Sequence, residues 1–208
     1  MNPINLAAVL SLVLANLAGD GAVKLRNEKV EVTECRLKPA EARKFEGRYP
    51  ALTVYFDDAS LEFTAQNGNR ESVKVRRGDV VFAAAAAGEF RNTGTSEVKF
   101  VRTEFLTDGD NATWGAAGLS PHYKMLVENR YTRTYDIKIP AGGREPQHTH
   151  RARVVICLSG ATLKHVMPNG REEPSTLKTG EVAWRLGSTH IGQNLGTTDL
   201  WVIAVEPK

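Results

Sequence analysis

From residue 27 onward the chain consists of short segments in which apolar and polar residues alternate, separated by glycine, asparagine and proline. Residues two apart in a β-strand point to the same face, so this alternation predicts strands with one buried face. The pattern is clearest at residues 27–33 and 130–139. Further strands are expected at 52–56, 60–64, 78–82, 98–105, 153–158, 162–166 and 201–205. Valine and threonine are common in these segments, and the chain is predicted to be all-β.

The strand pattern repeats with a fixed period, which indicates duplication of one domain. Four features recur 102 residues later, in the pairs Leu61 and Leu163, Asn67 and Asn169, Gly78 and Gly180, and Asn92 and Asn194. The Asn-Gly pairs that begin at Asn67 and Asn169 are strong hairpin signals. Farther upstream, Pro39 pairs with Pro140 at a spacing of 101, which predicts that the halves differ in length by one residue in between.

The repeat divides the chain into two lobes and a linker. We expect the first lobe at 28–105 and the second at 125–208, preceded by an N-terminal segment or signal at 1–27. The intervening residues 106–124 include Asp108-Gly-Asp-Asn and Ser120-Pro121, which are turn and linker sequences.

Residues 6–18 are uncharged and apolar, and they are too few to span a bilayer as a helix. Their number suits the core of a secretory signal, with Ala18 or Ala22 near a cleavage point, which predicts a periplasmic or secreted protein. No lysine or arginine precedes them. The alternative is therefore a cytoplasmic protein whose N-terminal helix packs on the barrel. A transmembrane protein is not expected.

The composition narrows the class of partners that the protein is expected to bind. The chain of 208 residues has 27 Lys and Arg against 24 Asp and Glu. The net charge of +3 is small and scattered, which argues against a nucleic-acid partner. The two cysteines, Cys35 and Cys157, form neither a CxxC motif nor a disulfide framework. Cys157 lies in an apolar run, so we expect a buried small hydrophobic residue and not a nucleophile.

The candidate chemistry lies in the second half, where His148 and His150 are separated by one residue and His190 follows later in the chain. In a strand, both imidazoles of His-Thr-His point to the same side, and a third from a neighbouring strand would complete a site for Zn, Fe, Ni or Mn. No histidine precedes His122, so the first lobe cannot build an imidazole site. At the spacing of 102, the three histidines correspond to Glu46, Arg48 and Gly88.

Glycines accompany these histidines at set distances. The first set is Gly142, His148, His150 and Gly160, and the second is Gly180, Gly187, His190 and Asn194. The two sets resemble the two motifs of the cupin superfamily, and the chain is similar to small exported bacterial cupin-domain proteins. The resemblance implies an all-β chain of two tandem cupin-type double-stranded β-helix (jelly-roll) barrels, a bicupin with a degenerate N-terminal lobe. It also implies a divalent metal held by the three histidines.

Two positions depart from the motifs. The acidic ligand of the family, counted back from the end of the first motif, falls on Arg153, and counted forward from His150 it falls on Val154 or Val155. The proline of the second motif is replaced by Leu186. A guanidinium stays charged and cannot ligate a metal. If Arg153 points inward, it opposes a cation or binds a carboxylate of the ligand; if it points outward, a plain three-histidine site remains.

The other conspicuous residues have structural interpretations. His122 is expected to be exposed in the linker. His165 corresponds to Phe63 in the repeat, so we expect it to line the barrel or face solvent and not to bind metal. Trp184 corresponds to Phe82, which predicts a packing role.

Two functions fit this sequence. The favoured one is a non-catalytic bicupin that binds a divalent metal or a small anionic ligand in its C-terminal barrel, with Arg153 as the ligand-binding residue. The alternative is a mononuclear three-histidine non-haem metal enzyme such as a dioxygenase. The catalytic residues of such an enzyme remain open, since Glu145 is the one acid close to the histidine pair. The expected partner is a small molecule or an anion, and a homodimer is left open.

Overall fold

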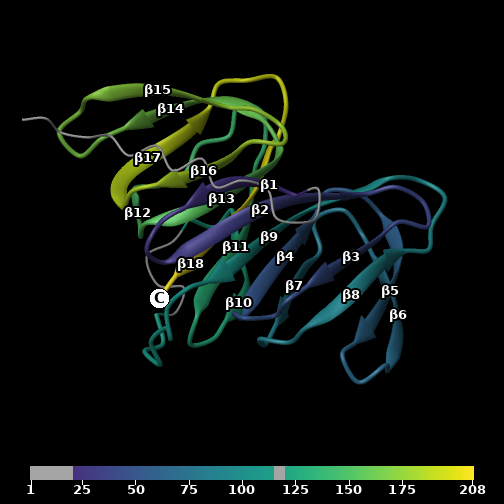
Figure 1. Ribbon diagram of the computed structural model, residues 1–208. Coiled ribbons are helices and arrows are strands. Elements are labelled where there is room, and N and C mark those ends of the chain that lie inside the picture. Colours follow the sequence, from purple (N-terminus) through teal and green to yellow (C-terminus); the bar gives the residue numbers. More distant parts are fainter. Residues whose placement is uncertain (1–20, 115–119) are drawn as a thin grey trace, which may run out of the picture.

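The computed structural model describes residues 21–114 and 120–208. These residues form eighteen strands and no helix, and all strand pairs are antiparallel. The all-β prediction is therefore confirmed. Figure 1 shows the strands gathered into two barrels, the first coloured purple to teal and the second green to yellow. No helix in the described part of the chain is long and apolar enough to cross a membrane. The apolar segment 6–18 lies outside the described residues.

The first barrel consists of two sheets. The five-stranded sheet has the order β1-β2-β9-β4-β7 and the four-stranded sheet has the order β3-β8-β5-β6. The strands are β1 (Ala22–Arg26), β2 (Val30–Leu37), β3 (Ala42–Phe45), β4 (Ala51–Tyr55), β5 (Ala59–Ala65), β6 (Arg70–Val75), β7 (Val80–Ala83), β8 (Gly88–Asn92) and β9 (Val98–Phe105). The first strand thus begins within the segment 1–27 that we assigned to the N-terminus.

The second barrel repeats this arrangement. Its five-stranded sheet has the order β10-β11-β18-β13-β16 and its four-stranded sheet has the order β12-β17-β14-β15. The strands are β10 (Tyr123–Glu128), β11 (Thr132–Ile139), β12 (His148–His150), β13 (Arg153–Ser159), β14 (Ala161–Val166), β15 (Glu172–Leu177), β16 (Val182–Arg185), β17 (Ser188–Asn194) and β18 (Leu200–Pro207). The first of these strands begins within the segment 106–124 that was expected to be linker.

The spacing of 102 residues holds for most strands, although β3 corresponds to the segment just before β12. At this offset, strand β2 corresponds to β11 and strand β9 corresponds to β18, and the two strands of each pair have identical lengths. The turn that follows β2 and the turn that follows β11 also keep the offset, because the positive φ of Ala40 (63°) recurs at Gly142 (72°). The prediction of a one-residue difference, drawn from Pro39 and Pro140, is therefore wrong. Pro39 lies one residue before the position of positive φ, and Pro140 lies two residues before it. The two prolines therefore occupy different places in the two turns.

A buried asparagine closes the same loop in each barrel. The Asn92 side chain donates to the carbonyls of Leu37 (2.9 Å) and Ser96 (2.8 Å). The Asn194 side chain donates to the carbonyls of Ile139 (3.1 Å) and Thr198 (2.9 Å). Because the first barrel uses this bond network without any histidine site, the asparagine of the second motif holds a loop in place.

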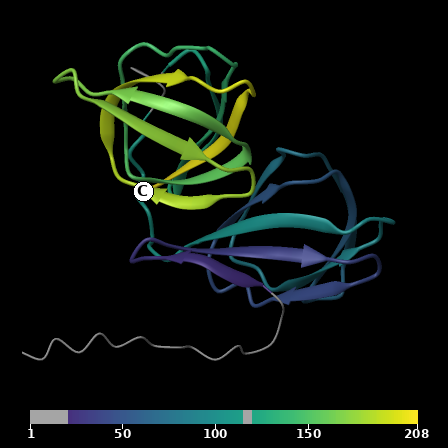
Figure 2. The same cartoon turned by 90° about the horizontal axis from the view of Figure 1, so that it is seen from above.

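Three cores stabilise the molecule. Each barrel has its own core, and a third lies between the two five-stranded sheets, which face each other. Figure 2, seen from above, shows the two barrels side by side. Along β13, Val155 and Cys157 point into the second barrel, whereas Val154, Ile156 and Leu158 point to the core between the barrels. Both faces of this strand are buried, which explains its unbroken apolar sequence.

The two cysteines are small core residues, as expected for Cys157. Both are buried and unpaired. Burial raises the pKa of each thiol to about 11, so neither is a thiolate at neutral pH.

Candidate metal centre

The three histidines come from neighbouring strands of one four-stranded sheet. In the register of β12 with β17, His148 lies directly opposite His190 and His150 lies opposite Ser188. Along β12 the two histidines are buried and Thr149 between them is exposed. The period of two along a strand thus turns both imidazoles inward, as the sequence predicts.

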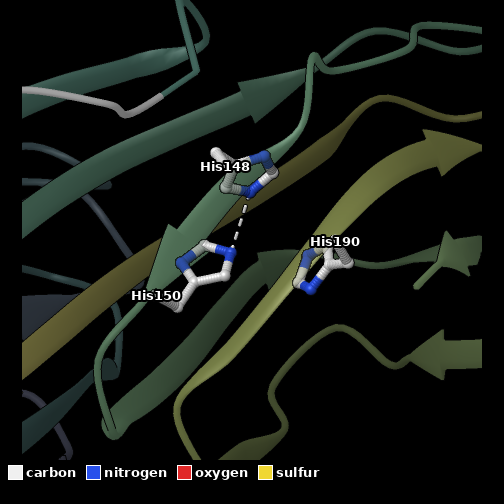
Figure 3. A group of neighbouring side chains, drawn as sticks. All are labelled: His148, His150 and His190. Atoms are coloured by element: carbon white, nitrogen blue, oxygen red, sulfur yellow. Dashed lines mark hydrogen bonds between the residues drawn. The ribbon is translucent and has the colours of Figure 1, made fainter. Parts of the chain in front are cut away.

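The imidazoles converge on one point. One nitrogen of each of His148, His150 and His190 lies within 4.8 Å of the other two. The Nε2 atoms of His148 and His150 are 2.9 Å apart, a contact drawn as the dashed line in Figure 3. Two nitrogens each about 2.1 Å from a shared ion and at a right angle would be about 3 Å apart. Among the described residues, this is the one group of three or more His, Cys, Asp or Glu with such geometry.

Neighbouring groups hydrogen-bond the Nδ1 atoms of two of the rings, and one of these bonds fixes the tautomer of His148. The Nδ1 of His148 lies 2.8 Å from the Pro146 carbonyl oxygen, so Nδ1–H donates and Nε2 carries the free lone pair. The Nδ1 of His190 lies 3.2 Å from the Ser188 hydroxyl. Such bonds to the far nitrogen fix the ring orientation of metal ligands.

The electrostatics keep two of the rings neutral. Burial, followed by the charge of Arg153, lowers the pKa of His150 far below its usual range. Burial, followed by the neighbouring His165, lowers the pKa of His190 to about 3. Neutral imidazole is the form that coordinates a metal, so no proton has to leave these rings at neutral pH.

Arg153 points into the barrel. It lies on the same face of β13 as Val155 and Cys157, and it is buried. Its Nη1 donates to the carbonyl of Arg151 (3.2 Å) and lies 3.5 Å from that of Leu186. Within the described ranges no carboxylate is in ion-pair contact with it. A buried guanidinium without a carboxylate partner faces the histidines across the barrel, so the inward alternative stated above holds.

Glu145 is the acid of this site. It is 4 % exposed, and its Oε2 lies 3.7 Å from Nε2 of His148. Its Oε1 has no hydrogen-bond partner among the described residues. Burial raises the pKa of Glu145, while His148 and the Ser120 hydroxyl act in the opposite direction. A buried carboxylate oxygen left without a partner fits a site that takes a cation.

The space for this carboxylate comes from a glycine on the histidine strand. A Cβ on Gly192 would lie 2.5 Å from Oε2 of Glu145. The Glu145 amide also donates to the Gly192 carbonyl at 2.8 Å. The sequence showed Glu145 three residues before His148, but only the pairing of this loop with β17 brings its carboxylate to the metal centre.

Tyr123 is a site residue that sequence reasoning missed. Its hydroxyl lies 3.2 Å from Nε2 of His150 and 3.4 Å from Nε2 of His148. It was assigned to the linker, whereas it begins β10, an edge strand of the five-stranded sheet. Burial raises the pKa of Tyr123 well above its ordinary value, so the phenol stays protonated. No signal in the sequence marked Tyr123, a polar residue at the start of a strand, for this role.

The remaining residues take the following places. His165 was expected to line the barrel or to face solvent, and it lines the barrel cavity. Its ring centroid is 4.3 Å from that of His190. Trp184 packs against the core between the barrels, which confirms its packing role. His122 is half-buried, so the expectation of an exposed residue is wrong. The Lys138 amide donates to the His122 carbonyl and anchors that segment on β11.

The cavity at this site is small. It has a volume of about 80 Å³ and is lined by His150, His190, Arg153 and Glu145 at its polar end. Its other end is apolar, with Ile137 and Val202 among the lining residues. Sites for drug-sized ligands measure roughly 300–1,000 Å³. This cavity therefore has room for an ion and a very small ligand.

No protein-family model and no curated protein matches this sequence. Solved structures do match. AerE from Microcystis aeruginosa aligns with a TM-score of 0.62 at 13 % identity, over 90 % of this chain and 97 % of that one. A cupin 2 conserved barrel domain protein from Leptotrichia buccalis aligns with a TM-score of 0.59 at 14 % identity, over 95 % and 93 %.

A variant of oxalate decarboxylase from Bacillus subtilis aligns with a TM-score of 0.58 at 11 % identity, over 86 % of this chain and 69 % of that one. A further match describes Mn(II) centres in that oxalate decarboxylase. At these identities the likenesses show the fold alone. The chain thus has the cupin fold, built as two tandem jelly-roll barrels, and its second barrel contains a buried three-histidine cluster.

Proposed function

We propose that this protein is a bicupin whose second barrel binds one divalent metal ion through His148, His150 and His190, together with a small anion. The observation that supports this proposal best is the convergence of three buried imidazole nitrogens within 4.8 Å. Two of these rings are held neutral by burial, and that is the state in which they bind metal. Imidazole ligands suit Zn, Fe and Ni, and Mn also occurs where oxygen ligands contribute.

The charges of the site favour an anion beside the metal. A divalent ion and the Arg153 guanidinium bring three positive charges, against one carboxylate at Glu145. Arg153 has bonds to backbone carbonyls only, so most of its donors remain available to a ligand. The volume of about 80 Å³ limits such an anion to a few heavy atoms, as in formate or carbonate.

The second candidate function is a mononuclear three-histidine metal enzyme of the dioxygenase kind. The Tyr123 hydroxyl favours it, because this group, which can give up a proton, has its oxygen 3.2 Å from Nε2 of His150. Glu145 is a second group in the cavity that can hold or accept a proton. A bound metal would supply Lewis-acid or redox chemistry there. The narrow cavity argues against substrates of ordinary metabolite size, and we therefore favour the non-catalytic function.

Metal analysis of the full-length protein, purified without added metal, tests this proposal. We expect at most one ion per chain. The substitutions His148→Ala, His150→Ala and His190→Ala should each remove most of it, since two imidazoles hold a divalent ion poorly. His122→Ala is the matched control, because His122 lies outside the cluster. Equal metal content in all five proteins would contradict the proposal, and a stoichiometry near two would place another site in the chain.

Export remains a proposal that rests on the apolar residues 6–18. The mature N-terminus of the protein, determined after expression from its full sequence, tests it. Cleavage near Ala18 or Ala22 is expected, whereas an intact N-terminus in the cytoplasmic fraction would favour the alternative.

A further inference from the structure

The first barrel has a cavity of about 370 Å³ beside the segment that corresponds to the histidine strand β12 of the second barrel. At the offset of 102 residues, Glu46 and Arg48 of its lining correspond to His148 and His150. In the first barrel, Ala42 of β3 lies opposite Arg91 of β8. In the second barrel, the corresponding Arg144, just before β12, lies opposite Gln193 of β17, so the two pairings are equivalent. The cavity thus adjoins the counterpart of the histidine pair, where the two imidazoles are replaced by the Glu46 carboxylate and the Arg48 guanidinium.

Arg102 is the central residue of this cavity. It lies on the same face of β9 as Phe100, which belongs to the core of the first barrel, and it is 6 % exposed. The corresponding residue of the second barrel is Ala204. The Nε of Arg102 donates to Glu104 at 3.3 Å. Its two terminal nitrogens make no hydrogen bond within the described ranges, although a guanidinium carries five N–H donors.

The cavity is positively charged. Its lining has five cationic side chains and three carboxylates, a surplus of two positive charges. All three carboxylates are paired: Glu31 with Arg26 at 2.8 Å, Glu46 with Arg48 at 2.6 Å and Glu104 with Nε of Arg102 at 3.3 Å. The cationic residues are Arg26, Arg43, Lys44, Arg48 and Arg102. A buried guanidinium with unused donors inside such a lining favours an anionic ligand.

An aromatic ring gives this site an apolar surface as well. The guanidiniums of Arg102 and Arg43 lie 5.0 Å and 5.6 Å from the ring centroid of Phe45. The volume falls within the range of ordinary small-molecule sites and is several times that of the second barrel's cavity. We propose that the first barrel binds a small organic anion, a carboxylate or a phosphate ester, with Arg102 as the residue that recognises its acidic group. This site is independent of the metal proposed for the second barrel.

Isothermal titration calorimetry of the full-length protein with citrate, and separately with inorganic phosphate, tests this site. We expect saturable binding of at least one of them to the wild type. Arg102→Met keeps most of the side-chain volume and removes the donors, and it should weaken binding at least about tenfold. Arg43→Met at the same cavity should weaken it as well, and it serves if the buried Arg102 substitution fails to fold. Arg70→Met, at an exposed position on β6, is the matched control and should bind as the wild type does.

The His148→Ala variant separates the two barrels. It should retain anion binding by the first barrel with unchanged affinity, even where its metal is lost. Binding that is lost in His148→Ala but unchanged in Arg102→Met and Arg43→Met would assign the anion to the second barrel and overturn the proposal. Absence of binding of both citrate and phosphate at 10 mM (roughly the weakest affinity that a buried guanidinium site should show) would overturn it too. Equal affinity in the wild type and all variants would show unspecific binding and have the same consequence.

Discussion

Arg153 is the residue that most affects what the second barrel binds. It is buried, points inward, and stands where the resemblance places an acidic metal ligand. Its charge repels a divalent ion and attracts an anion. The missing acid is replaced in part by Glu145, which comes from the loop before β12. In the proposed function, the site therefore combines a weakened cation site with an anion site.

The substitution Arg153→Glu should raise metal affinity. At a separation of about 5 Å and an effective dielectric constant of about 20, two unit charges interact by about 3 kcal/mol. Reversing the charge removes this repulsion and adds an attraction, so the increase should be at least about a hundredfold even after relaxation. Competition with a fluorescent chelator measures it. Arg153→Met should show a smaller increase, and Arg171→Met on the exposed hairpin none. Unchanged affinity in both Arg153 variants would show that the guanidinium does not face the ion.

The buried cysteines allow a test of the core at the residue scale. Because burial raises the pKa of Cys35 and Cys157 to about 11, thiolates form in the native protein only near or above that pH. In the unfolded chain an ordinary thiol has a pKa of about 8.5. We expect no reaction of either cysteine with Ellman's reagent at pH 8 in the native state and full reaction in guanidinium chloride. Rapid labelling of the native protein would contradict the cores described here.

At the scale of elements, strand β17 supplies both His190, a proposed metal ligand, and the space for the acid. His190 points into the site, and two residues later Gly192 leaves room for the Glu145 carboxylate. The period of two along the strand places both on the same face. The loop before β12 is held to this strand by backbone bonds between Glu145 and Gly192 and between Asn194 and Gly143.

The substitution Gly192→Ala should lower metal affinity with little loss of stability. Its Cβ would displace the end of the flexible Glu145 side chain, and Gly192 does not have a positive φ. Glu145→Gln should have the same effect by removing the charge at nearly constant shape. We expect a loss of at least about tenfold in each, because a buried charge partner is removed. Chelator competition and urea denaturation measure the two quantities.

Glu97→Gln, at an exposed ion pair with Arg36 on the first barrel, is the control for that experiment. If Glu145→Gln binds metal as the wild type does while the histidine variants do not, the metal centre stands and the role of Glu145 is refuted. A Gly192→Ala protein that loses several kcal/mol of stability would show that Glu145 cannot move aside.

At the scale of the whole molecule, the barrels share a core. Val30, Leu52 and Val101 of the first barrel pack in one cluster with Ile156 and Ile203 of the second. Figures 1 and 2 show the barrels joined along this side, while the histidine strands β12 and β17 belong to the other sheet of the second barrel. The first barrel thus stabilises the sheet that carries Arg153 without contributing a histidine.

A fragment that begins at Ser120, before β10, should be aggregated or dimeric. Removing the first barrel exposes Val154, Ile156, Leu158, Ile203 and Val205, and each such side chain gains roughly 1.5–3 kcal/mol from burial. It also exposes apolar strand surface to other chains. Sedimentation velocity and a thermal melt measure this, with the full-length protein as reference. A soluble monomer that melts cooperatively would show that the second barrel folds alone.

The sequence by itself determined the all-β class, about half of the strands, the duplication and the three histidines. These follow from local rules: alternation assigns faces, glycine and asparagine mark turns, and a spacing of two puts His148 and His150 on one side. The correspondence of most strands with a strand 102 residues away follows from the same signals. The turn at Ala40 shows where sequence matching fails. Pairing Pro39 with Pro140 predicted a one-residue difference between the halves, whereas the backbone conformation of the turn shows none.

Only the tertiary structure decided the direction of Arg153 and the approach of Glu145 and Tyr123. Alternation tells which residues share a face, but β13 is buried on both faces, so its pattern does not distinguish the barrel interior from the core between the barrels. Glu145 and Tyr123 reach the histidines through pairings of a loop and of an edge strand, which no local pattern encodes. Long-range packing sets which face looks inward, and with it the charge of the site.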